Sequence, residues 1–498
     1  MNYVSTRNSQ VKVTASAAIT KGISADGGLF VPESIPVLGS ADIEKLCSMD
    51  YVSRAKYVLS MYLTDFTQEE IDSCVNGAYA TGSFDSPAVA PLKCLGDGLN
   101  ILELWHGPTC AFKDMALQIL PRFMTVSASR TAKGTEIVIL VATSGDTGKA
   151  ALEGFKDVEN TRILVFYPND GVSPMQKLQM CTQEGANVGV SAISGNFDDA
   201  QSGVKKIFTD ARIGAVLAEN GKAFSSANSI NWGRLVPQIV YYISAYCDMI
   251  TSGKIANGDK VNFVVPTGNF GNILAAYYAR EMGIPVNKLV CASNANSVLT
   301  DFLTTGVYDR NRSFYTTISP SMDILISSNL ERLLFAAAGS EKVCGWMKQL
   351  SDEGKYTVDA DTFDFISSGF AAGCCSDEET KALIGSLFAE QGYLCDTHTA
   401  VGVKVYCDYR EKTGDTTPTV IASTANPFKF SKAVLEAVGG STEGLDEFDM
   451  VEKLAEVTGE ECPAPLAGLR NKAVRFSGCC SRDSASMEKV IMDMLGIK

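Results

Sequence analysis

Six short apolar runs, separated by segments long enough to form helices, constrain the fold of this sequence more than any other feature. Each run is rich in β-branched residues and nearly continuous, which is typical of strands that are covered on both faces. The segments between them include an amphipathic stretch at 273–283. Alternation of this kind predicts mostly parallel α/β sheets. The six predicted strands span 136–143, 162–168, 186–193, 261–269, 288–294 and 418–424.

The first 95 residues follow a different pattern and predict a separate unit. Helical patterns dominate them, and the segment at 26–38 leaves room for a hairpin. The stretch from about 305 to 393 is polar and helix-prone. At 498 residues the chain is too long for one small core, so its length indicates two or three domains.

Charge and cysteine content narrow the class of protein. The net charge of −14 argues against a nucleic-acid partner and an anionic-membrane patch, since both need clustered lysine and arginine. No apolar stretch approaches the length that spans a bilayer, and the N-terminal residues lack the apolar run of a secretory signal. The fifteen cysteines include no C-x-x-C pair and no metal-ligand spacing. We therefore expect a cytoplasmic protein with reduced thiols and no metal site.

Two glycine-containing loops follow predicted strands and could hold anions. The first, SGDTG at 144–148, does not match the P-loop pattern, because Thr143 and Ala150 stand where glycine and Ser or Thr are required. Its turn and the helix that follows still present free backbone N–H groups. The second, TGNFGN at 267–272, has two glycines that permit a tight nest of N–H groups in front of a helix. It predicts a phosphate cradle, although such turns are also common without a ligand.

The chain contains too few histidines for most catalytic or metal sites that depend on them. Only His106 and His398 are present, and each is expected to be a hydrogen-bonded structural residue. A Ser-His-Asp triad or a three-histidine metal site is therefore disfavoured. Chemistry based on an amine or a cofactor becomes more attractive.

Lys113 is the best candidate for amine chemistry. It lies among apolar residues between Ala111 and Leu117, whereas most helical lysines are solvated. Desolvation would lower its pKa and favour the free amine, which forms a Schiff base with an aldehyde. Together with a phosphate cradle at 268–272, this predicts pyridoxal 5′-phosphate as the cofactor, with its aldehyde on Lys113.

Seven motifs resemble, in the same order, the threonine synthase family in the longer form found in yeast and enteric bacteria. An early segment, ADGGLFVP at 25–32, is similar to that family's N-terminal part as well. The matches cover about the whole chain. The seven motifs are ELWHGPTCAFKD (103–114), ATSGDTG (142–148), SANSINWGR (226–234), VVPTGNFGN (264–272), SPSMDILISSN (319–329), DTHTAVG (396–402) and STANPFKF (423–430).

The resemblance implies a fold-type II α/β enzyme, similar to the β subunit of tryptophan synthase. Such an enzyme would convert O-phospho-L-homoserine and water into L-threonine and phosphate. Two α/β domains would accompany a mainly helical N-terminal domain at 1–95. The larger domain, which binds the cofactor, would comprise 96–135 and 236–498, and the smaller would comprise 136–235. A monomer or a homodimer is expected.

The same resemblance implies roles for individual residues. Lys113 would bind the cofactor and move protons as the catalytic residue, and Thr424 would face the pyridine nitrogen. Arg234 and Lys429 are the cations expected for the substrate's anionic ends, with a structural salt bridge as the alternative for Arg234. The residues implied to hold the cofactor phosphate are Gly268, Asn269, Phe270, Gly271 and Asn272. Those implied to bind the substrate are Ser144, Gly145, Asp146, Thr147, Asn228, Ser229, Asn231, Arg234 and Lys429.

Three residues depart from the family's usual motifs. Asn426 and Phe428 stand where His and Ala are usual, and Asn272 stands where Asp is usual. None of the three differences removes Lys113, the lysine expected to bind the cofactor. Two alternatives stay open: a related phospholyase or Ser/Thr dehydratase, which releases a keto acid and ammonia, and a non-catalytic regulatory relative.

Overall fold

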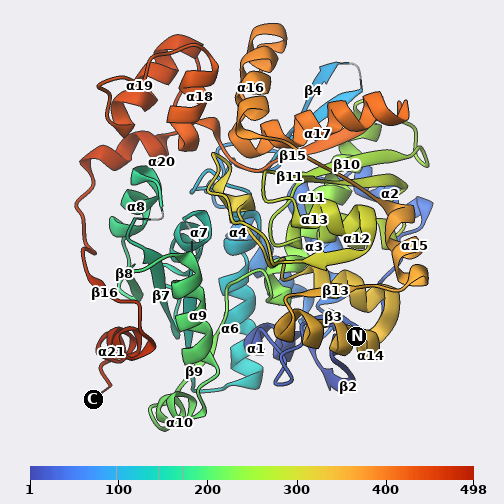
Figure 1. Cartoon of the computed structure of the whole chain (residues 1–498). Coiled ribbons are helices and arrows are strands. Elements are labelled where there is room, and N and C mark those ends of the chain that lie inside the picture. Colours follow the sequence, from blue (N-terminus) through green and yellow to red (C-terminus); the bar gives the residue numbers. More distant parts are fainter. Residues whose placement is uncertain (97, 144, 171, 498) are drawn as a thin grey trace.

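The computed structural model describes residues 1–96, 98–143, 145–170 and 172–497, and it is built around two separate α/β sheets (Figure 1). One sheet has six strands in the order β14-β11-β10-β15-β5-β4, and the other has five in the order β16-β8-β7-β6-β9. All neighbours in both sheets are parallel except the pair β4 and β5. The predicted parallel α/β architecture is therefore confirmed.

The six-stranded sheet is covered on both faces, as the continuous apolar runs predicted. Val264 and Ile421 belong to the apolar cluster that includes α17, whereas Phe263 and Val265 belong to the cluster that includes α11 and α12. Successive side chains of a strand point to opposite faces, so each strand contributes to both clusters. The strands are β4 (Leu92–Gly96), β5 (Leu99–Glu103), β10 (Val261–Pro266), β11 (Val286–Ser293), β14 (Phe370–Cys374) and β15 (Thr419–Ser423); the helices are α11 (Trp232–Thr251), α12 (Gly271–Glu281) and α17 (Thr397–Thr413).

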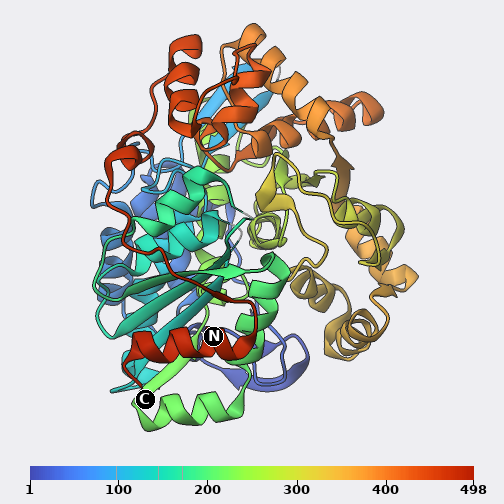
Figure 2. The same ribbon diagram turned by 60° about the vertical axis from the view of Figure 1, so that its left-hand side comes forward.

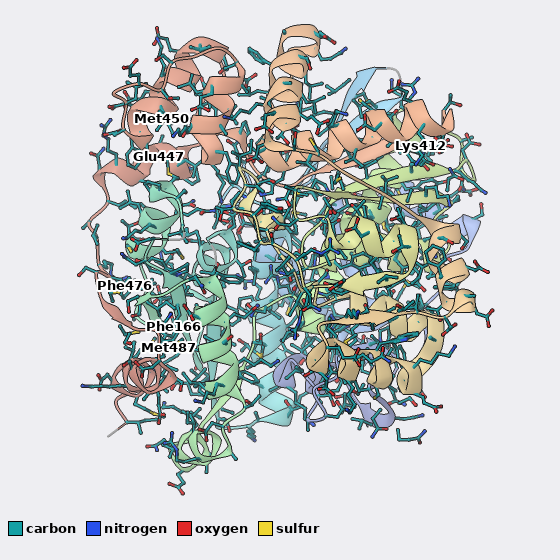
Figure 3. The ribbon with its side chains drawn as sticks, viewed as in Figure 1. Phe166, Lys412, Glu447, Met450, Phe476 and Met487 are labelled. Atoms are coloured by element: carbon teal, nitrogen blue, oxygen red, sulfur yellow. The ribbon has the colours of Figure 1, made fainter. Side chains whose placement is uncertain are left out.

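The five-stranded sheet receives its last strand from the far end of the chain. Strand β16 (Cys479–Ser481) pairs with β8, and helix α21 (Ser484–Leu495) packs on α9, as Figure 2 shows. Met487 on α21 and Phe166 on β7 share one apolar cluster, and both are labelled in Figure 3. The other elements are β6 (Glu136–Ala142), β7 (Thr161–Pro168), β8 (Val188–Ser194), β9 (Lys222–Ser225), α7 (Asp146–Phe155), α8 (Pro174–Cys181), α9 (Phe197–Phe208) and α10 (Ala211–Glu219).

The predicted smaller domain ended at residue 235. It therefore did not include the C-terminal elements β16 and α21, which join the five-stranded sheet. A three-residue strand such as β16, with the sequence Cys-Cys-Ser, is too short to form an apolar run that could reveal it. The division of the chain into three domains itself stays a prediction.

The N-terminal 80 residues combine helices with a small antiparallel sheet. Strands β1 and β2 form a hairpin, and β3 pairs with β1 on its other side. Helices α2 and α3 pack against the long central helix α11. The elements are β1 (Tyr3–Ser5), β2 (Asn8–Val13), α1 (Ala15–Lys21), β3 (Phe30–Pro32), α2 (Ser40–Cys47), α3 (Tyr51–Tyr62) and α4 (Gln68–Tyr79).

The remaining elements surround the six-stranded sheet. Within the described residues, no helix is both long enough and apolar enough to cross a membrane. The helices are α5 (Asp114–Leu117), α6 (Leu120–Thr131), α13 (Val298–Thr305), α14 (Leu330–Asp352), α15 (Ala360–Gly369), α16 (Asp377–Gln391), α18 (Ser431–Ala437), α19 (Glu447–Thr458) and α20 (Ala464–Ala467). Strands β12 (Val307–Asp309) and β13 (Lys355–Thr357) form a two-stranded sheet, and the short 3₁₀ turns are η1 (Pro320–Met322), η2 (Pro427–Phe430) and η3 (Gly468–Asn471).

Candidate active site

Lys113 lies in a turn just before the short helix α5, rather than inside a helix as the sequence pattern suggested. The carboxylate of Asp114 accepts hydrogen bonds from the backbone N and the Oγ1 of Thr109, at 2.8 and 2.7 Å. The backbone N of Phe112 donates to the carbonyl of Thr424 at 2.8 Å. Because Thr424 follows β15, this bond places the lysine turn at the carboxyl end of the six-stranded sheet.

The amine of Lys113 is buried, with 7% of the residue exposed. Its Nζ donates to the Oγ of Ser321 at 3.2 Å and lies 3.6 Å from Oδ2 of Asp146. Burial lowers the pKa of Lys113 to about 8. Asp146 opposes this shift, while the positive charges of Arg234 and Lys429 add to it. An amine with this pKa is partly deprotonated near neutral pH, as an amine nucleophile or base requires.

Asp146, at the start of α7, joins Lys113 to a second buried lysine. Its Oδ1 lies 2.9 Å from Nζ of Lys429, which also donates to the carbonyl of Thr109 at 2.8 Å. Burial alone would raise the pKa of Asp146, but Lys429 and Lys113 hold it well below its usual range. Lys429 therefore has partners within its own chain, an ion pair that no local sequence pattern indicated. The prediction that Lys429 binds the substrate stays a prediction.

The loop at 267–272 has the form of an anion cradle. Phe270 takes a left-handed conformation (φ 62°) directly before α12. Ser327 Oγ donates to the carbonyl of Gly268, and Asn329 donates to the carbonyl of Asn269, so these carbonyl groups are occupied. By contrast, the amide groups from Gly268 to Asn272 donate to no acceptor within the part of the chain that the structure describes. Free amides at a helix N-terminus bind anions.

Two further observations describe the walls of the cradle. A Cβ atom on Gly268 would lie 2.5 Å from the carbonyl oxygen of Ser321, so only glycine fits there. Asn272 is 7% exposed, and its Oδ1 accepts from Tyr241 and Tyr242 at 2.5 and 2.6 Å. Its Nδ2 has no partner among the described residues. A buried donor without an acceptor favours a bound acceptor group.

Arg234, in the first turn of α11, is a buried cation without an ionic partner among the described residues. It is 5% exposed, and its Nη1 donates to the carbonyl of Ala227 at 2.9 Å. No acidic side chain of the described residues pairs with it, so the structural salt bridge considered as an alternative is absent there. Burial lowers its pKa to about 10. A buried guanidinium of this kind favours an anionic ligand.

The loop before Arg234 contains Asn231, whose side chain is hydrogen-bonded within the chain. The side chain of Asn231 caps α11: its Oδ1 accepts from Gly233, and its Nδ2 donates to the carbonyls of Ile19 and Ser226. These contacts use its hydrogen-bonding groups within the chain and hold the loop in place, and its role in substrate binding stays a prediction. Asn228 and Ser229 are half-buried in the same loop, and their predicted roles stay predictions.

The loop after β6 offers a second, smaller group of free amides. Gly145 has a φ of 139°, and a Cβ there would lie 2.3 Å from the side-chain amide of Gln176. The amides of Gly145 and Gly148 donate to Thr143 Oγ1. Those of Asp146 and Thr147 have no acceptor among the described residues, although they stand at the start of α7. The predicted residue Ser144 lies outside the described residues.

Comparison with known proteins places this site in a family. Residues 84–424 match the family model described as pyridoxal-phosphate dependent enzyme, residues 2–79 match the threonine synthase N terminus, and residues 399–491 match the threonine synthase C-terminal model. The chain is 38% identical to the threonine synthase of Schizosaccharomyces pombe, over 87% of this chain and 88% of the relative. The chain belongs to the threonine synthase family. The predicted fold-type II architecture and the predicted cofactor are confirmed with it.

Solved structures of the family have the same fold over their whole length. The structure of threonine synthase from Brucella melitensis with bound pyridoxal phosphate matches with a TM-score of 0.87 and 38% identity, covering 99% of both chains. The yeast enzyme matches with a TM-score of 0.88 and 33% identity, again over 99% of each chain. Human threonine synthase-like 1 is 40% identical over 88% of this chain. The chain spans about six tenths of the length of that relative.

Several residues at the site were not predicted. Ser321 contacts Lys113, and its backbone N donates to Nε2 of His398 at 3.2 Å. Gln176 donates to Oδ1 of Asp146 at 3.2 Å, and Asn329 holds the cradle as described above. Ser321, Asn329 and His398 lie within motifs that carried the family resemblance, and that is the signal that could have found them. Gln176 has no such signal.

Proposed function

We propose that this chain catalyses the conversion of O-phospho-L-homoserine and water into L-threonine and phosphate, with pyridoxal 5′-phosphate as its cofactor. The observation that carries the proposal is the grouping of a buried amine, Lys113, with the amides of the cradle and the buried guanidinium of Arg234. Neither the amides nor the guanidinium has an anionic partner in the part of the chain that the structure describes. The substrate has a carboxylate at one end and a phosphate at the other. A site for it needs separate anion-binding groups on the two sides of the reacting carbons.

The residues present fit the cofactor. Its phosphate would be held by the backbone amides from Gly268 to Asn272, with the N-terminus of α12 adding a partial positive charge. Lys113 would bind its aldehyde through the ε-amino group, and Thr424 would offer a neutral hydroxyl to the pyridine nitrogen. When bound, the cofactor supplies a conjugated ring that accepts electrons from the substrate.

The chain's own residues would divide the remaining work. The Nζ of Lys113, whose pKa of about 8 lies near neutral pH, would remove and return protons on the substrate's carbon atoms. The free amides of Asp146 and Thr147 would bind the α-carboxylate. Arg234 would bind the phosphate that leaves, with Asn228 and Ser229 as neutral donors. Burial of these groups strengthens each interaction because water does not screen them.

A related phospholyase is the second candidate. Its support is that the threonine synthase-like 1 proteins are as similar to this chain as the threonine synthases are, at 40% for the human protein and 38% for that of Schizosaccharomyces pombe. The cytoplasmic location and the monomeric or homodimeric state expected from the sequence stay predictions.

Product analysis tests the proposal. The purified holoenzyme is incubated with O-phospho-L-homoserine, and threonine, inorganic phosphate, keto acid and ammonia are each quantified. Equal amounts of threonine and phosphate are expected, with slow deamination of serine and threonine, because a pocket built for a phosphate leaves polar groups unpaired with the smaller substrates. Keto acid and ammonia as main products would replace the synthase by the phospholyase.

A further inference from the structure

Ser321 is the point where four parts of the active site meet. Its hydroxyl accepts from Nζ of Lys113 at 3.2 Å and lies 3.5 Å from Oδ2 of Asp146, to which it donates. Its backbone N donates to His398, and its carbonyl oxygen closes the space over Gly268. One residue therefore contacts the catalytic amine, the carboxylate beside it and the wall of the cradle.

His398 fixes the position of Ser321. The Nδ1 of His398 lies 2.9 Å from Oδ1 of Asp396, and the ring packs on Phe430 at 4.8 Å between centroids. With the proton on Nδ1 shared with Asp396, Nε2 is left as the acceptor for the backbone N of Ser321. Thr397, the neighbouring residue on α17, also donates to the carbonyl of Ile318 at 2.8 Å. The start of α17 thus holds the segment at 318–321 by two hydrogen bonds.

The other end of this segment is held independently. Asp323 accepts from the backbone N and the Oγ1 of Thr317, at 3.0 and 2.8 Å, and from Asn294 at 2.7 Å. The turn that presents Ser321 is therefore anchored on both sides. Such support is what holds a hydroxyl within a few tenths of an ångström of a reacting group.

We propose that Ser321 is a positioning residue that holds the free amine of Lys113, its hydroxyl accepting from Nζ and donating to Asp146, and that His398 sets its place. This inference rests on the proposed role of Lys113 as the proton-moving group. When the amine is not bound to the cofactor, it needs a defined location from which to reach the substrate. Ser321 and Asp146 provide that location.

Charged groups surround Lys113, whereas the hydroxyl of Ser321 is a neutral hydrogen-bond partner for its amine. Asp146 on α7 faces the amine with a negative charge, while Arg234 on α11 and Lys429 on η2 face it with positive ones. His398 lies beyond Ser321, and a positive charge on it would lower the pKa of Asp146. The hydroxyl of Ser321 is an uncharged acceptor that stabilises the ammonium form without adding a further charge.

The test measures the protonation of Lys113 directly, without relying on turnover. The full-length protein, freed of cofactor, is labelled with trace acetic anhydride between pH 6 and 10, and peptide mass analysis gives the labelled fraction of Lys113. In Ser321→Ala the inflection should move to lower pH by about 0.5 to 1 unit, since the ammonium form loses an acceptor. Ser321→Thr, which keeps a hydroxyl, should restore the original inflection. An exposed serine on α16 provides the matched control, Ser386→Ala, which should leave the profile unchanged.

The second pair of variants tests His398. Leucine at this position removes the acceptor for the Ser321 backbone N, whereas glutamine can still accept there. His398→Leu should therefore shift the Lys113 inflection in the same direction as Ser321→Ala, and His398→Gln should retain most of the original value. An unchanged or raised inflection in both Ser321→Ala and His398→Leu would overturn the proposal. Because labelling does not depend on the product formed, failure of the proposed synthase activity would be seen separately.

Discussion

Two buried lysines, Lys113 and Lys429, face opposite oxygens of the same carboxylate, yet their surroundings differ. Lys429 is 1% exposed and is bound at 2.9 Å to Asp146 and at 2.8 Å to the carbonyl of Thr109. Lys113 is 7% exposed, lies 3.6 Å from the other oxygen of Asp146, and has one hydroxyl as its hydrogen-bond partner. Burial alone therefore does not make a lysine reactive. We propose that the amine with fewer and weaker partners is the one available for chemistry, and that the tightly bound one orders the site.

The largest expected effect follows from removing the reactive lysine. In Lys113→Ala, kcat with O-phospho-L-homoserine should fall by about 10⁴-fold, because no other amine can move the protons. The fold should stay intact, since alanine leaves no unpaired charge at this position except that of Asp146, which Lys429 still neutralises. Lys432→Ala, at an exposed position on α18, is the matched control. Activity within about tenfold of wild type in Lys113→Ala would contradict the proposal that Lys113, rather than Lys429, is the reactive amine.

Removing the structural lysine should affect stability instead. Lys429→Met leaves Asp146 buried without its main partner, which should lower the free energy of unfolding by about 3–5 kcal/mol. Urea denaturation of the cofactor-free protein measures this free energy of unfolding. The double variant Lys429→Met with Asp146→Asn should recover part of the loss, because the unpaired charge is gone. A change below about 1 kcal/mol would mean that the ion pair does not order the site.

Arg234, the buried cation near these lysines, should contribute to substrate recognition. Arg234→Met keeps the apolar part of the side chain but removes the charge. The value of kcat/KM for O-phospho-L-homoserine should fall by about 10- to 100-fold, as for loss of a hydrogen bond to a charged group. Slow deamination of serine, which has no phosphate, should change far less. Equal losses for both substrates would place Arg234 in a structural role.

The smallest expected effect is a pH dependence that separates Lys113 from an ordinary lysine. Only the deprotonated amine reacts with an aldehyde, and burial lowers the pKa of Lys113 to about 8. The rate at which the cofactor-free protein recombines with pyridoxal 5′-phosphate should rise about tenfold per pH unit below pH 8 and level off above it. A solvated lysine would level off only above about pH 10. Stopped-flow absorbance between pH 6.5 and 9.5 distinguishes the two.

Much of the architecture could be predicted from the sequence, because it depends on local pattern. The apolar runs gave β6, β7, β8, β10, β11 and β15 within a few residues. Strands β4, β5, β9, β14 and β16 of the two sheets were missed, since each has at most five residues and none forms a long apolar run. In β14 and β16, small residues and cysteines dominate, and the pairing partners lie far away in the chain. The same limit explains why the C-terminal helix α21 was not assigned to the five-stranded sheet.

At the site, local signals identified single residues but not their partners. Lys113 was recognisable from its apolar neighbours, and the cradle from its glycines. The pairing of Lys429 with Asp146 was not predictable, because the two residues are distant in sequence and meet only in the folded chain. Asn231 could have been recognised as a helix cap, since it directly precedes a long apolar helix. Ser321 lies within a family motif, but its residue type alone does not indicate its role, which depends on the groups that surround it in the folded chain.

The most direct test of the account is the identity of the lysine that binds the cofactor. The holoenzyme is reduced with borohydride, which makes the link between cofactor and protein permanent, and is then digested and mapped by mass spectrometry. The pyridoxyl mass should be found on the peptide that contains Lys113. Pyridoxyl mass on Lys429 or on any other lysine would contradict the assignment of Lys113 as the reactive amine.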